Sequence, residues 1–424
     1  MNKEPNHTAM GELNRREDHD QRGGKNGPTV SRSSLCLCVS VVVLGLALPL
    51  VAQQSRMYRD GNCWVEEITG AMPAARELRV NTDVGSVQVQ GNAPRVSYVI
   101  RKRSYATAQP AARKQFEQMH ISTMRAGDSD VVEGKLVSRN QLRFGVEFIL
   151  QVPREISLVK VQTRNGSLAF SSIAATIEAT TGAGLIKLDD LAGPVKIASG
   201  GGNVEAGNLG SDLTLTSGAA DVRVANVGGQ TQVSLGGGRV YIGSSRASTI
   251  QTGAGSIQVQ KCIGDLHVIS GGGNLYLGDV DGAVQAETEG GSVRLASASG
   301  PVSVTTGGGS VELYKLARGA QVETGAGPIV VEFVGNRGFS DSFLHTAAGD
   351  VTVCFARNFP VTVHATSDMA VGRGIFSDLP GLNITQQGGT YSPKSMSAEG
   401  ALNGGGPALR IRTTMGQIGF RRCQ

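Results

Sequence analysis

The side chains of this sequence that could carry out chemistry are carboxylates, present singly or in loose pairs. Asp189 and Asp190 are adjacent, and Asp279 and Asp281 flank Val280. Polysaccharide hydrolases use two carboxylates on either side of the scissile bond, and carboxylate oxygens also bind Ca²⁺. Asp189 and Asp190 fall where the chain is expected to turn, which favours a solvated turn. The second pair lacks the GGxGxDxUx repeat of calcium-binding solenoids, so only weak Ca²⁺ binding is left open for it.

The histidines are equally isolated. His267 is expected to face outward from a strand, among neighbours that are unlike metal ligands; the others beyond residue 52 are His120, His345 and His364. The GxSxG, HExxH and Walker motifs are absent from the sequence, and its GGG runs lack the lysine and helix of a phosphate-binding loop. We therefore predict no catalytic, cofactor-binding or metal-binding residues, no cofactor, and a protein that is not an enzyme.

Three tyrosines project from related positions of a repeat. These residues are Tyr241, Tyr276 and Tyr314. Aromatic rings of this kind could contact sugar rings, and they could equally be ordinary strand residues.

Composition limits both the fold and the partners. Glycine accounts for 59 of 424 residues, about twice the average frequency of roughly 7%. Aromatic residues are only 4%, too few to fill a wide globular core, whereas a hydrophobic content of 40% excludes wholesale disorder. The net charge is +5 and the basic residues are dispersed, so nucleic acid is not an expected partner.

The chain repeats with a period of 18 residues. Units begin at Arg164, Gly182, Gly200, Gly218, Gly236, Gly253, Gly271, Glu289, Gly307, Gly325 and Ala347, and the unit at Gly236 has 17 residues. Position 3 of the unit is glycine everywhere except at Ala220, which implies a close backbone approach that a Cβ would hinder. Position 4 is usually Ser, Asn or Asp, as turns prefer.

Apolar residues recur in pairs within each unit. Positions 5 and 7, as in Ile186 and Leu188, and positions 14 and 16, as in Val195 and Ile197, are apolar. Apolar residues two apart indicate a strand with one buried face. Each unit therefore holds two short strands and two turns, with no room for a crossover helix. Position 6 faces outward and carries opposite charges on some adjacent units, which would support the register.

These features predict an all-β fold, a single-chain β-solenoid of about eleven 18-residue coils with β-rich N- and C-terminal caps. An antiparallel meander is the competing architecture. A hexapeptide solenoid is disfavoured because apolar residues do not recur every six positions. The expected segments are a leader (1–52), a linker (53–75), an N-terminal β cap (76–163), the solenoid repeat (164–366) and a C-terminal cap (367–424). Within the caps, 111–119 is expected to be a short helix or loop, and 370–408 mostly loop.

The leader contains an uncharged apolar run, Leu35–Leu50, followed by small and polar residues. This pattern indicates a signal peptide or an uncleaved signal anchor, so the chain is expected in the periplasm, at the cell surface or outside the cell, either free or anchored through residues 35–52. In an oxidising compartment the cysteines beyond the leader could form disulfides or stay as free thiols. These are Cys63, Cys262, Cys354 and Cys423.

Three stretches around the repeat match a known pattern. The chain enters the repeat through VEFILQVPREISLVKVQTRNGSL (146–168), and it leaves through GDVTVCFARNFPVTVHATS (349–367) and LNGGGPALRIRTTMGQIGFRR (402–422). With the glycine-rich units between them, they resemble the DUF4097 family of bacterial adhesin-like proteins over about residues 76–422. Phe355-Ala356 departs from the Leu-Pro-like pair of that family. The resemblance implies an exported envelope β-solenoid and no particular chemistry.

The sequence as a whole predicts a structural or adhesin-like protein of the cell envelope that presents a β-solenoid surface for binding, without catalysis. The expected partner is an envelope polymer or protein of unknown identity, and self-association is also open. Contact with a membrane is expected only through an uncleaved N-terminal anchor. The alternatives are a carbohydrate-active β-helix protein that binds or cleaves polysaccharide, and a scaffold that assembles through its solenoid ends.

Overall fold

The computed structural model describes residues 53–73, 75–137, 143–335, 338–389 and 392–423. The predicted leader lies outside these residues. The described chain consists of strands and one helix, as the repeat predicts. No helix in these ranges is long and apolar enough to cross a bilayer.

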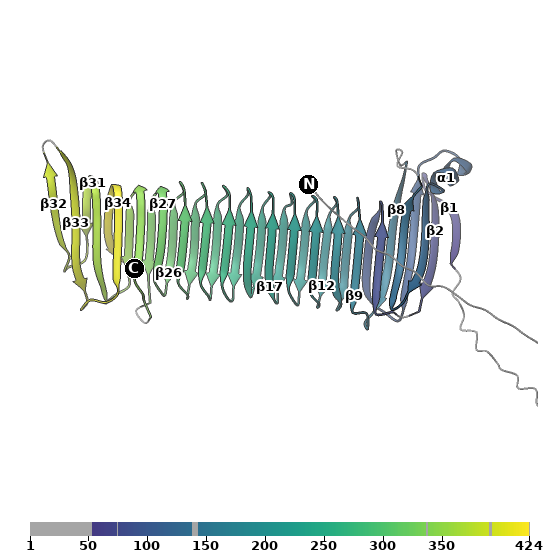
Figure 1. Cartoon of the computed structure of the whole chain (residues 1–424), viewed down its shortest axis with the longest axis horizontal. Coiled ribbons are helices and arrows are strands. Elements are labelled where there is room, and N and C mark those ends of the chain that lie inside the picture. Colours follow the sequence, from purple (N-terminus) through teal and green to yellow (C-terminus); the bar gives the residue numbers. More distant parts are fainter. Residues whose placement is uncertain (1–52, 74, 138–142, 336–337, 390–391, 424) are drawn as a thin grey trace, which may run out of the picture. The chain divides into compact units, whose positions relative to one another are not determined.

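Eleven successive coils form the body, and each contributes one strand to an odd-numbered column and one to an even-numbered column (Figure 1). The odd column contains β9 (Leu158–Thr163), β11 (Thr176–Thr181), β13 (Val195–Ser199), β15 (Leu213–Ser217), β17 (Gln230–Leu235), β19 (Ala247–Thr252), β21 (Leu266–Ser270), β23 (Val284–Thr288), β25 (Val302–Thr306), β27 (Ala320–Ala326) and β29 (Ser342–Ala348). The even column contains β10 (Leu168–Ile173), β12 (Ile186–Leu191), β14 (Val204–Leu209), β16 (Val222–Val227), β18 (Val240–Ser245), β20 (Ile257–Cys262), β22 (Leu275–Val280), β24 (Val293–Ala298), β26 (Val311–Leu316), β28 (Ile329–Phe333) and β30 (Val351–Phe355).

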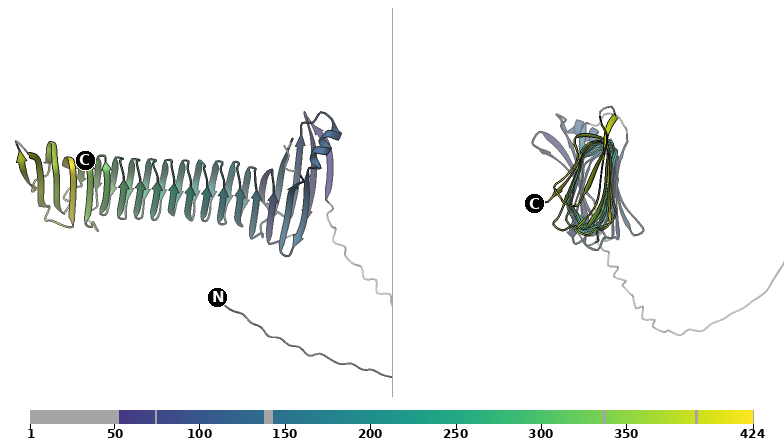
Figure 2. Two further views of the ribbon diagram at one scale, coloured as in Figure 1. Left: turned by 45° about the horizontal axis from the view of Figure 1, so that its top comes forward. Right: turned by 90° about the vertical axis from the view of Figure 1, so that its left-hand side faces the viewer.

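Strands within a column pair in parallel with their equivalents in the next coil. Ile186 lies opposite Val204, and Val195 lies opposite Leu213, so the register advances by one 18-residue unit. This arrangement confirms the β-solenoid, and it excludes the antiparallel meander for the repeat. Seen along the stack, the coils superimpose as a flattened outline with two layers (Figure 2).

The core fills the narrow space between the two columns. Residues at positions 5, 7, 14 and 16 are buried in nearly every coil, so like residues stack on like. In the 17-residue unit, two buried serines, Ser245 and Ser248, stand where most coils have apolar residues. Their hydroxyl groups hydrogen-bond to each other at 2.6 Å inside the core. A buried polar pair that satisfies itself avoids most of the cost of desolvation.

One corner of each coil combines a glycine with a hydroxyl side chain. A Cβ on Gly291, at position 3, would come closer than 3.0 Å to the carbonyl of Gly273 in the preceding coil. The hydroxyl of Thr306 donates to the Gly291 carbonyl at 2.9 Å. The same bond from position 18 is made by Thr181, Thr252, Ser270, Thr288, Thr324 and Thr346. The recurring glycine therefore reflects a close approach between coils, as the sequence predicts.

Polar side chains at position 4 also join successive coils. The Asn274 side chain accepts from the Ser292 backbone N–H at 2.9 Å, and Asp221 accepts from the Arg239 N–H at 3.0 Å. At position 6, Arg294 pairs with Glu312 at 3.2 Å in the next coil. Because this pair is largely exposed, it contributes between a few tenths of a kcal/mol and about 1 kcal/mol to the stability of the fold.

The N-terminal cap contains β1 (Gln54–Asp60), β2 (Cys63–Met72), β3 (Glu77–Thr82), β4 (Ser86–Ala93), β5 (Val96–Ser104), α1 (Gln109–Phe116), β6 (Met119–Ala126), β7 (Ser129–Leu136) and β8 (Phe144–Pro153). β3 pairs with β9 and β4 pairs with β10, so residues 77–93 already form a coil. The cap closes this coil with β7 and β8. The prediction of a linker over 53–75 was wrong, because β1 and β2 form an antiparallel hairpin there, and β2 pairs with β5.

The C-terminal cap contains β31 (Val361–Ser377), β32 (Asn383–Gly389), β33 (Ser392–Leu402) and β34 (Ala408–Arg422). β34 pairs with both β29 and β30, so one long strand closes both columns. The expectation of loops over 370–408 was wrong, because β32 and β33 form an antiparallel hairpin. Cys423 forms a disulfide with Cys354, whereas Cys63 and Cys262 are free thiols.

Glu67 on β2 is the centre of an ion-pair network in the N-terminal cap. Its side chain is 5% exposed and accepts from Arg101 Nε at 2.9 Å and from Arg56 Nη2 at 2.6 Å. The hydrogen bond from Arg101, opposed by burial and assisted by Arg56, lowers the pKa of Glu67 below its ordinary value of 4.5. The ionised carboxylate is therefore stabilised in the folded state.

Replacing Glu67 by glutamine is expected to reduce the free energy of unfolding at pH 7 by about 1.5–3 kcal/mol, the usual contribution of a hydrogen bond to a charged group. Because the folded pKa is lowered, this contribution is present above pH 4.5 and is lost as the pH falls through the folded pKa. Urea unfolding of wild type and E67Q at pH 7 and pH 3 measures it. An equal difference between the two proteins at both pH values would contradict this account.

Candidate functional site

The outward face of the odd column contains a long groove. Its cavity has a volume of about 790 Å³ and runs past eight successive levels, from Asp212 to Asp341. At a strand spacing of about 4.8 Å, seven steps correspond to roughly 34 Å. The groove therefore runs along the stack, across the strands rather than parallel to them.

Small residues at one corner of the coils form the hollow. Counted by strand register with the neighbouring coils, position 13 is Ala247, Ala283, Pro301 or Gly319 in four of the eight lining coils, whereas coils such as those of Asp212, Gln230 and Asp265 carry longer side chains there. Position 14 points into the core, so only position 15 projects from the strands beside this corner. Short side chains at position 13 next to longer ones at position 15 leave an open channel between them.

The residues that project into this channel from position 15 are polar and uncharged, whereas three aspartates, Asp212, Asp265 and Asp341, also line it. Position 15 forms a ladder in which each residue lies opposite its equivalent in the next coil. We call these seven residues the polar ladder: Thr214, Gln232, Thr249, His267, Gln285, Ser303 and Gln321. Each one offers at least one hydrogen-bond donor or acceptor, and the amides of glutamine offer both.

His267 lies in the middle of the polar ladder, between Thr249 and Gln285. It faces outward, as the sequence predicts, although its ring is partly buried by its neighbours. Its Nε2 atom has no hydrogen-bond partner in the described part of the chain. Nothing in the sequence indicates that this histidine belongs to a groove, because the groove depends on the small residues at position 13.

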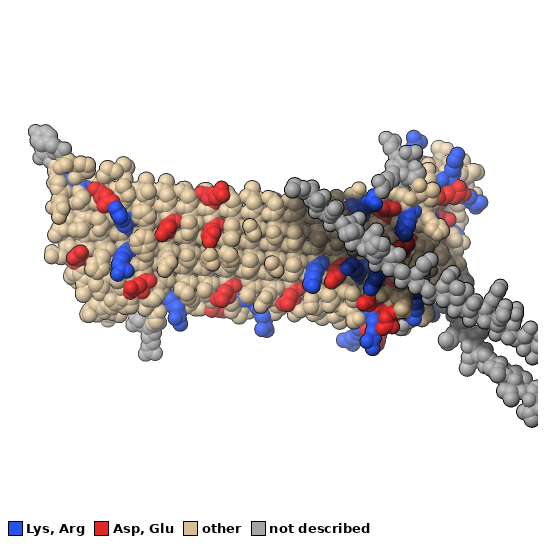
Figure 3. Space-filling model, viewed as in Figure 1, with Lys and Arg blue, Asp and Glu red and all other residues tan. Residues whose placement is uncertain are grey.

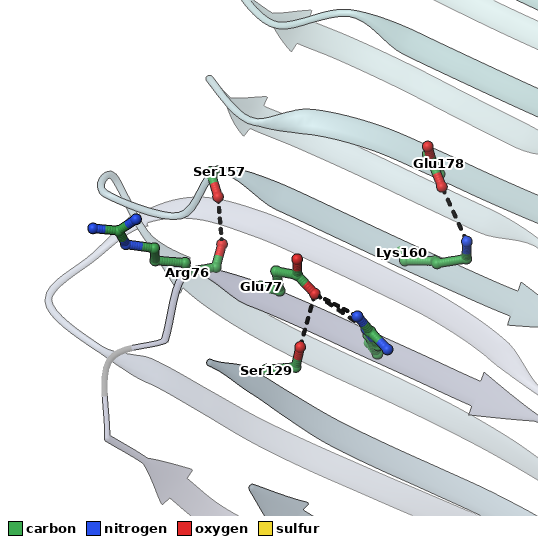
Figure 4. Close-up of polar contacts among 7 residues, drawn as sticks. Arg76, Glu77, Ser129, Ser157, Lys160 and Glu178 are labelled. Atoms are coloured by element: carbon green, nitrogen blue, oxygen red, sulfur yellow. Dashed lines mark hydrogen bonds and ion pairs between the residues drawn. The ribbon is translucent and has the colours of Figure 1, made fainter. Parts of the chain in front are cut away.

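Charged residues flank the polar ladder at its N-terminal end. On the same face, Lys160 pairs with Glu178 at 3.1 Å (Figure 4). Lys196 lies opposite both Glu178 and Thr214. Glu77 accepts from Ser129 at 2.7 Å, and this bond, followed by the one from Arg79, lowers its pKa. Figure 3 shows the same trend on its visible face, where charged side chains crowd near the N-terminal cap and thin out along the coils.

The carboxylates along the groove are structural. Asp212, Asp265 and Asp341 accept from the backbone N–H groups of Gln230, Ala283 and Ala408, each at 2.8 Å. Asp212 and Asp265 stand three coils apart, about 14 Å at the spacing of paired strands, and Asp341 lies four coils further on. Carboxylates that act together on a glycosidic bond lie about 5–9.5 Å apart. These aspartates, which were not singled out from the sequence, do not form such a pair.

Three of the carboxylates singled out from the sequence, Asp189, Asp190 and Asp279, lie on the even column, away from the groove, and Asp281 directly follows β22. Asp189 and Asp190 lie within β12 rather than in a turn, and Asp190 adopts a left-handed φ of 51°. The Asp190 side chain accepts from Ser172 at 3.2 Å, and Asp279 accepts from Ser297 at 2.6 Å. Across the described ranges, no three His, Cys, Asp or Glu side chains are placed to hold a metal ion.

The three tyrosines also belong to the even column. Arg223 lies over the ring of Tyr241 at 5.0 Å, and Arg294 lies over that of Tyr314 at 5.4 Å. The Tyr314 hydroxyl donates to Glu312 at 3.1 Å, and burial together with this carboxylate raises its pKa. Tyr276 is exposed beside a smaller hollow of about 330 Å³. The rings are therefore engaged with neighbours or separated, and they do not form a stacked platform.

No family model and no curated protein matches the chain. Several solved structures do. One, described as a putative cell adhesion protein from Clostridium sporogenes, is 9% identical, and the match covers 85% of this chain and 100% of that one with a TM-score of 0.21. A second, described as a putative adhesin from Parabacteroides merdae, is 15% identical, with 70% and 98% covered and a TM-score of 0.25. A third, described as a putative lipid binding protein from Parabacteroides distasonis, is 11% identical, with 86% and 98% covered and a TM-score of 0.20. Membership of the DUF4097 family stays a prediction.

Proposed function

We propose that the chain is an exported, non-catalytic binding protein of adhesin-like type, whose groove holds an extended, uncharged polymer of the cell envelope. The main support for this proposal is the polar ladder. Seven uncharged hydrogen-bonding side chains follow one another at one-coil intervals along a continuous channel. A site of this kind recognises a repeating ligand rather than a single small molecule.

A polysaccharide fits this channel better than a peptide. Coils repeat at about 4.8 Å, close to the length of one sugar unit in an extended chain, so successive hydroxyl groups can meet successive ladder residues. An extended peptide presents side chains on one face every two residues, about 6.6 Å apart. This spacing does not match the spacing of the coils, so successive side chains would not meet successive ladder residues. The channel also crosses the strands, so a peptide in it would have no strand edge with which to pair.

The distribution of charge and carboxylates supports binding without catalysis. The polar ladder carries no charged residue, which disfavours polyanions such as nucleic acid, whose binding depends on clustered Lys and Arg. The aspartates beside it are too far apart for paired acid–base chemistry and are already hydrogen-bonded to backbone N–H groups. A polysaccharide-cleaving enzyme is therefore the less favoured alternative.

Two further features support an exported location. The apolar run Leu35–Leu50 is typical of an export signal. The disulfide between Cys354 and Cys423 fits an oxidising compartment, in which such bonds persist.

Removing two glutamine amides from the polar ladder is expected to weaken polymer binding by about 10- to 30-fold, since each lost hydrogen bond is worth about 1 kcal/mol. The variant is Q285A/Q321A, and affinity electrophoresis through linear uncharged glucans and mannans measures the effect. A matched control is Q258A/Q260A on the even column, which should bind within about twofold of wild type.

Three results would contradict the proposal. The groove variant could bind as well as wild type, or the control could lose binding equally. Alternatively, an anionic polymer such as polygalacturonate could bind better than the uncharged ones. Release of reducing ends during incubation would instead support the enzymatic alternative.

A further inference from the structure

The outermost strand of the C-terminal cap, β32, has a free edge. β32 pairs with β33 on one side only, and no other described strand pairs with it. It lies at the end of the stack, beyond β33 and β31 (Figure 1). Backbone N–H and C=O groups on the outer side of such a strand have no partner within the sheet and can pair with another chain.

The two ends of the stack differ in how their edges are protected. Two described N-terminal strands, β1 and β6, pair on one side only. β1 carries Arg56, Arg59 and Asp60, and β6 carries Arg125; charges of this kind discourage pairing between edges. β32 has the sequence NITQQGG, with no charge and no proline, and all its residues except Gly389 are exposed. The register with β33 shifts between Gln387 and Gly389, so the stretch from Asn383 to Gln387 is the regular part of this edge, without a charge, a proline or a bulge to prevent strand addition.

Exposed apolar side chains also gather in this part of the chain. Of eleven large hydrophobic residues that are exposed in the described ranges, four lie between residues 369 and 415. They are Met369, Val371, Ile384 and Met415. Apolar groups left on the surface at one end of a protein commonly mark an interface.

We infer that two copies of this chain associate through β32, with the two strands antiparallel across a twofold axis. Identical strands that carry charge would place like charges near one another in such a pair. β32 avoids this because its side chains are amides, hydroxyls and one isoleucine, and the amides of Asn383, Gln386 and Gln387 can both donate and accept hydrogen bonds. Pairing of β32 with β1 of another copy would instead place an uncharged edge against a charged one. Such a head-to-tail contact would build an open chain of copies rather than a closed dimer.

This dimer would join the odd columns of two copies into one continuous sheet. An antiparallel pair of identical strands has its twofold axis perpendicular to the sheet, so both grooves would lie on the same face. If the groove binds a polymer as proposed above, one long chain could engage both copies and gain from the high effective concentration of the second site. Only this consequence rests on the proposed function; the dimer itself does not.

Sedimentation of the purified full chain without any polymer tests the inference. Wild type should form a dimer of the 44.0 kDa chain, with no larger species as concentration rises. The double variant Q386K/Q387K places lysines on the edge and is expected to raise the dimer dissociation constant at least tenfold. A control variant, Q258K, carries a lysine on an exposed site of the even column and should dimerise like wild type.

The far-ultraviolet circular dichroism spectrum of each variant should match that of wild type, which separates loss of the dimer from loss of the fold. A wild-type monomer at all concentrations, a dimer that persists in Q386K/Q387K, or growth into filaments would each overturn the inference. Because the readout contains no polymer, failure here leaves the groove assignment untouched, and failure of polymer binding leaves the dimer untouched.

Discussion

Replacing Gly291 by alanine is expected to lower the free energy of unfolding by at least about 3 kcal/mol, at the upper end of what overpacking costs. The added Cβ would meet the carbonyl group of Gly273 in the preceding coil at less than 3.0 Å. Neither partner can move aside, because both belong to the backbone and the distance between coils is fixed by the parallel hydrogen bonds of both columns. The substitution would also disturb the Thr306 hydroxyl, which donates to the Gly291 carbonyl.

The neighbouring glycine provides a matched control. A Cβ on Gly290 would meet nothing within 4 Å, so G290A should change the free energy by no more than about 0.5–1 kcal/mol. The pair Gly309 and Gly308 offers the same contrast one coil further on. Urea unfolding followed by circular dichroism measures both pairs. If G291A and G290A had equal stability, close contact between coils would not explain the position-3 glycine.

Removing the disulfide between Cys354 and Cys423 is expected to have the second largest effect. The bond closes a loop across 69 residues of sequence, and chain entropy assigns such a loop about 4 kcal/mol of stability. It joins the end of β34 to β30, whose pairing closes the even column. C354S should therefore loosen the C-terminal cap first, because each coil of a solenoid is stabilised mainly by its neighbours.

Limited proteolysis and urea unfolding of C354S measure this effect. New cleavage sites are expected within residues 356–422, together with a lower unfolding midpoint, and reduction of the wild type should reproduce both. The control is C63S, since Cys63 is a free thiol near the opposite end of the stack. Identical cleavage patterns for wild type and C354S would show that the bond does not hold the cap in place.

The repeat itself could be predicted from the sequence because its signals are local and recur. Pairs such as Ile186 and Leu188 identify the buried face of a strand, and the 18-residue period fixes which residues stack. The parallel register of Ile186 with Val204 follows directly from that period. The outward direction of His267 could be predicted for the same reason.

The caps were harder to predict because they do not repeat. In β2 the alternation of apolar residues is interrupted by Glu67, which is buried only because Arg56 and Arg101 neutralise it. The segment around β32 and β33 is rich in Gly and Ser, a composition typical of loops, yet backbone pairing orders it. Cys354 and Cys423 are far apart in sequence, and their spacing carries no information about pairing.

The groove could not be predicted from the apolar pattern. It depends on the short side chains at position 13, such as Ala283 and Gly319, which look like ordinary turn residues in the sequence. Only the stacking of coils turns them into a channel beside position 15. That Gln285 and Gln321 line a groove is therefore visible in the folded structure and not in the sequence.

The length dependence of binding tests the central claim most directly. Linear uncharged glucan oligosaccharides of increasing length are titrated into the protein by calorimetry. The groove spans roughly 34 Å at the spacing of paired strands, so affinity should rise steadily with each added sugar until the chain fills it and should then level off. The same series with Q285A/Q321A should rise less steeply. An affinity that does not change with length, or binding only to the shortest sugars, would contradict a groove built for an extended polymer.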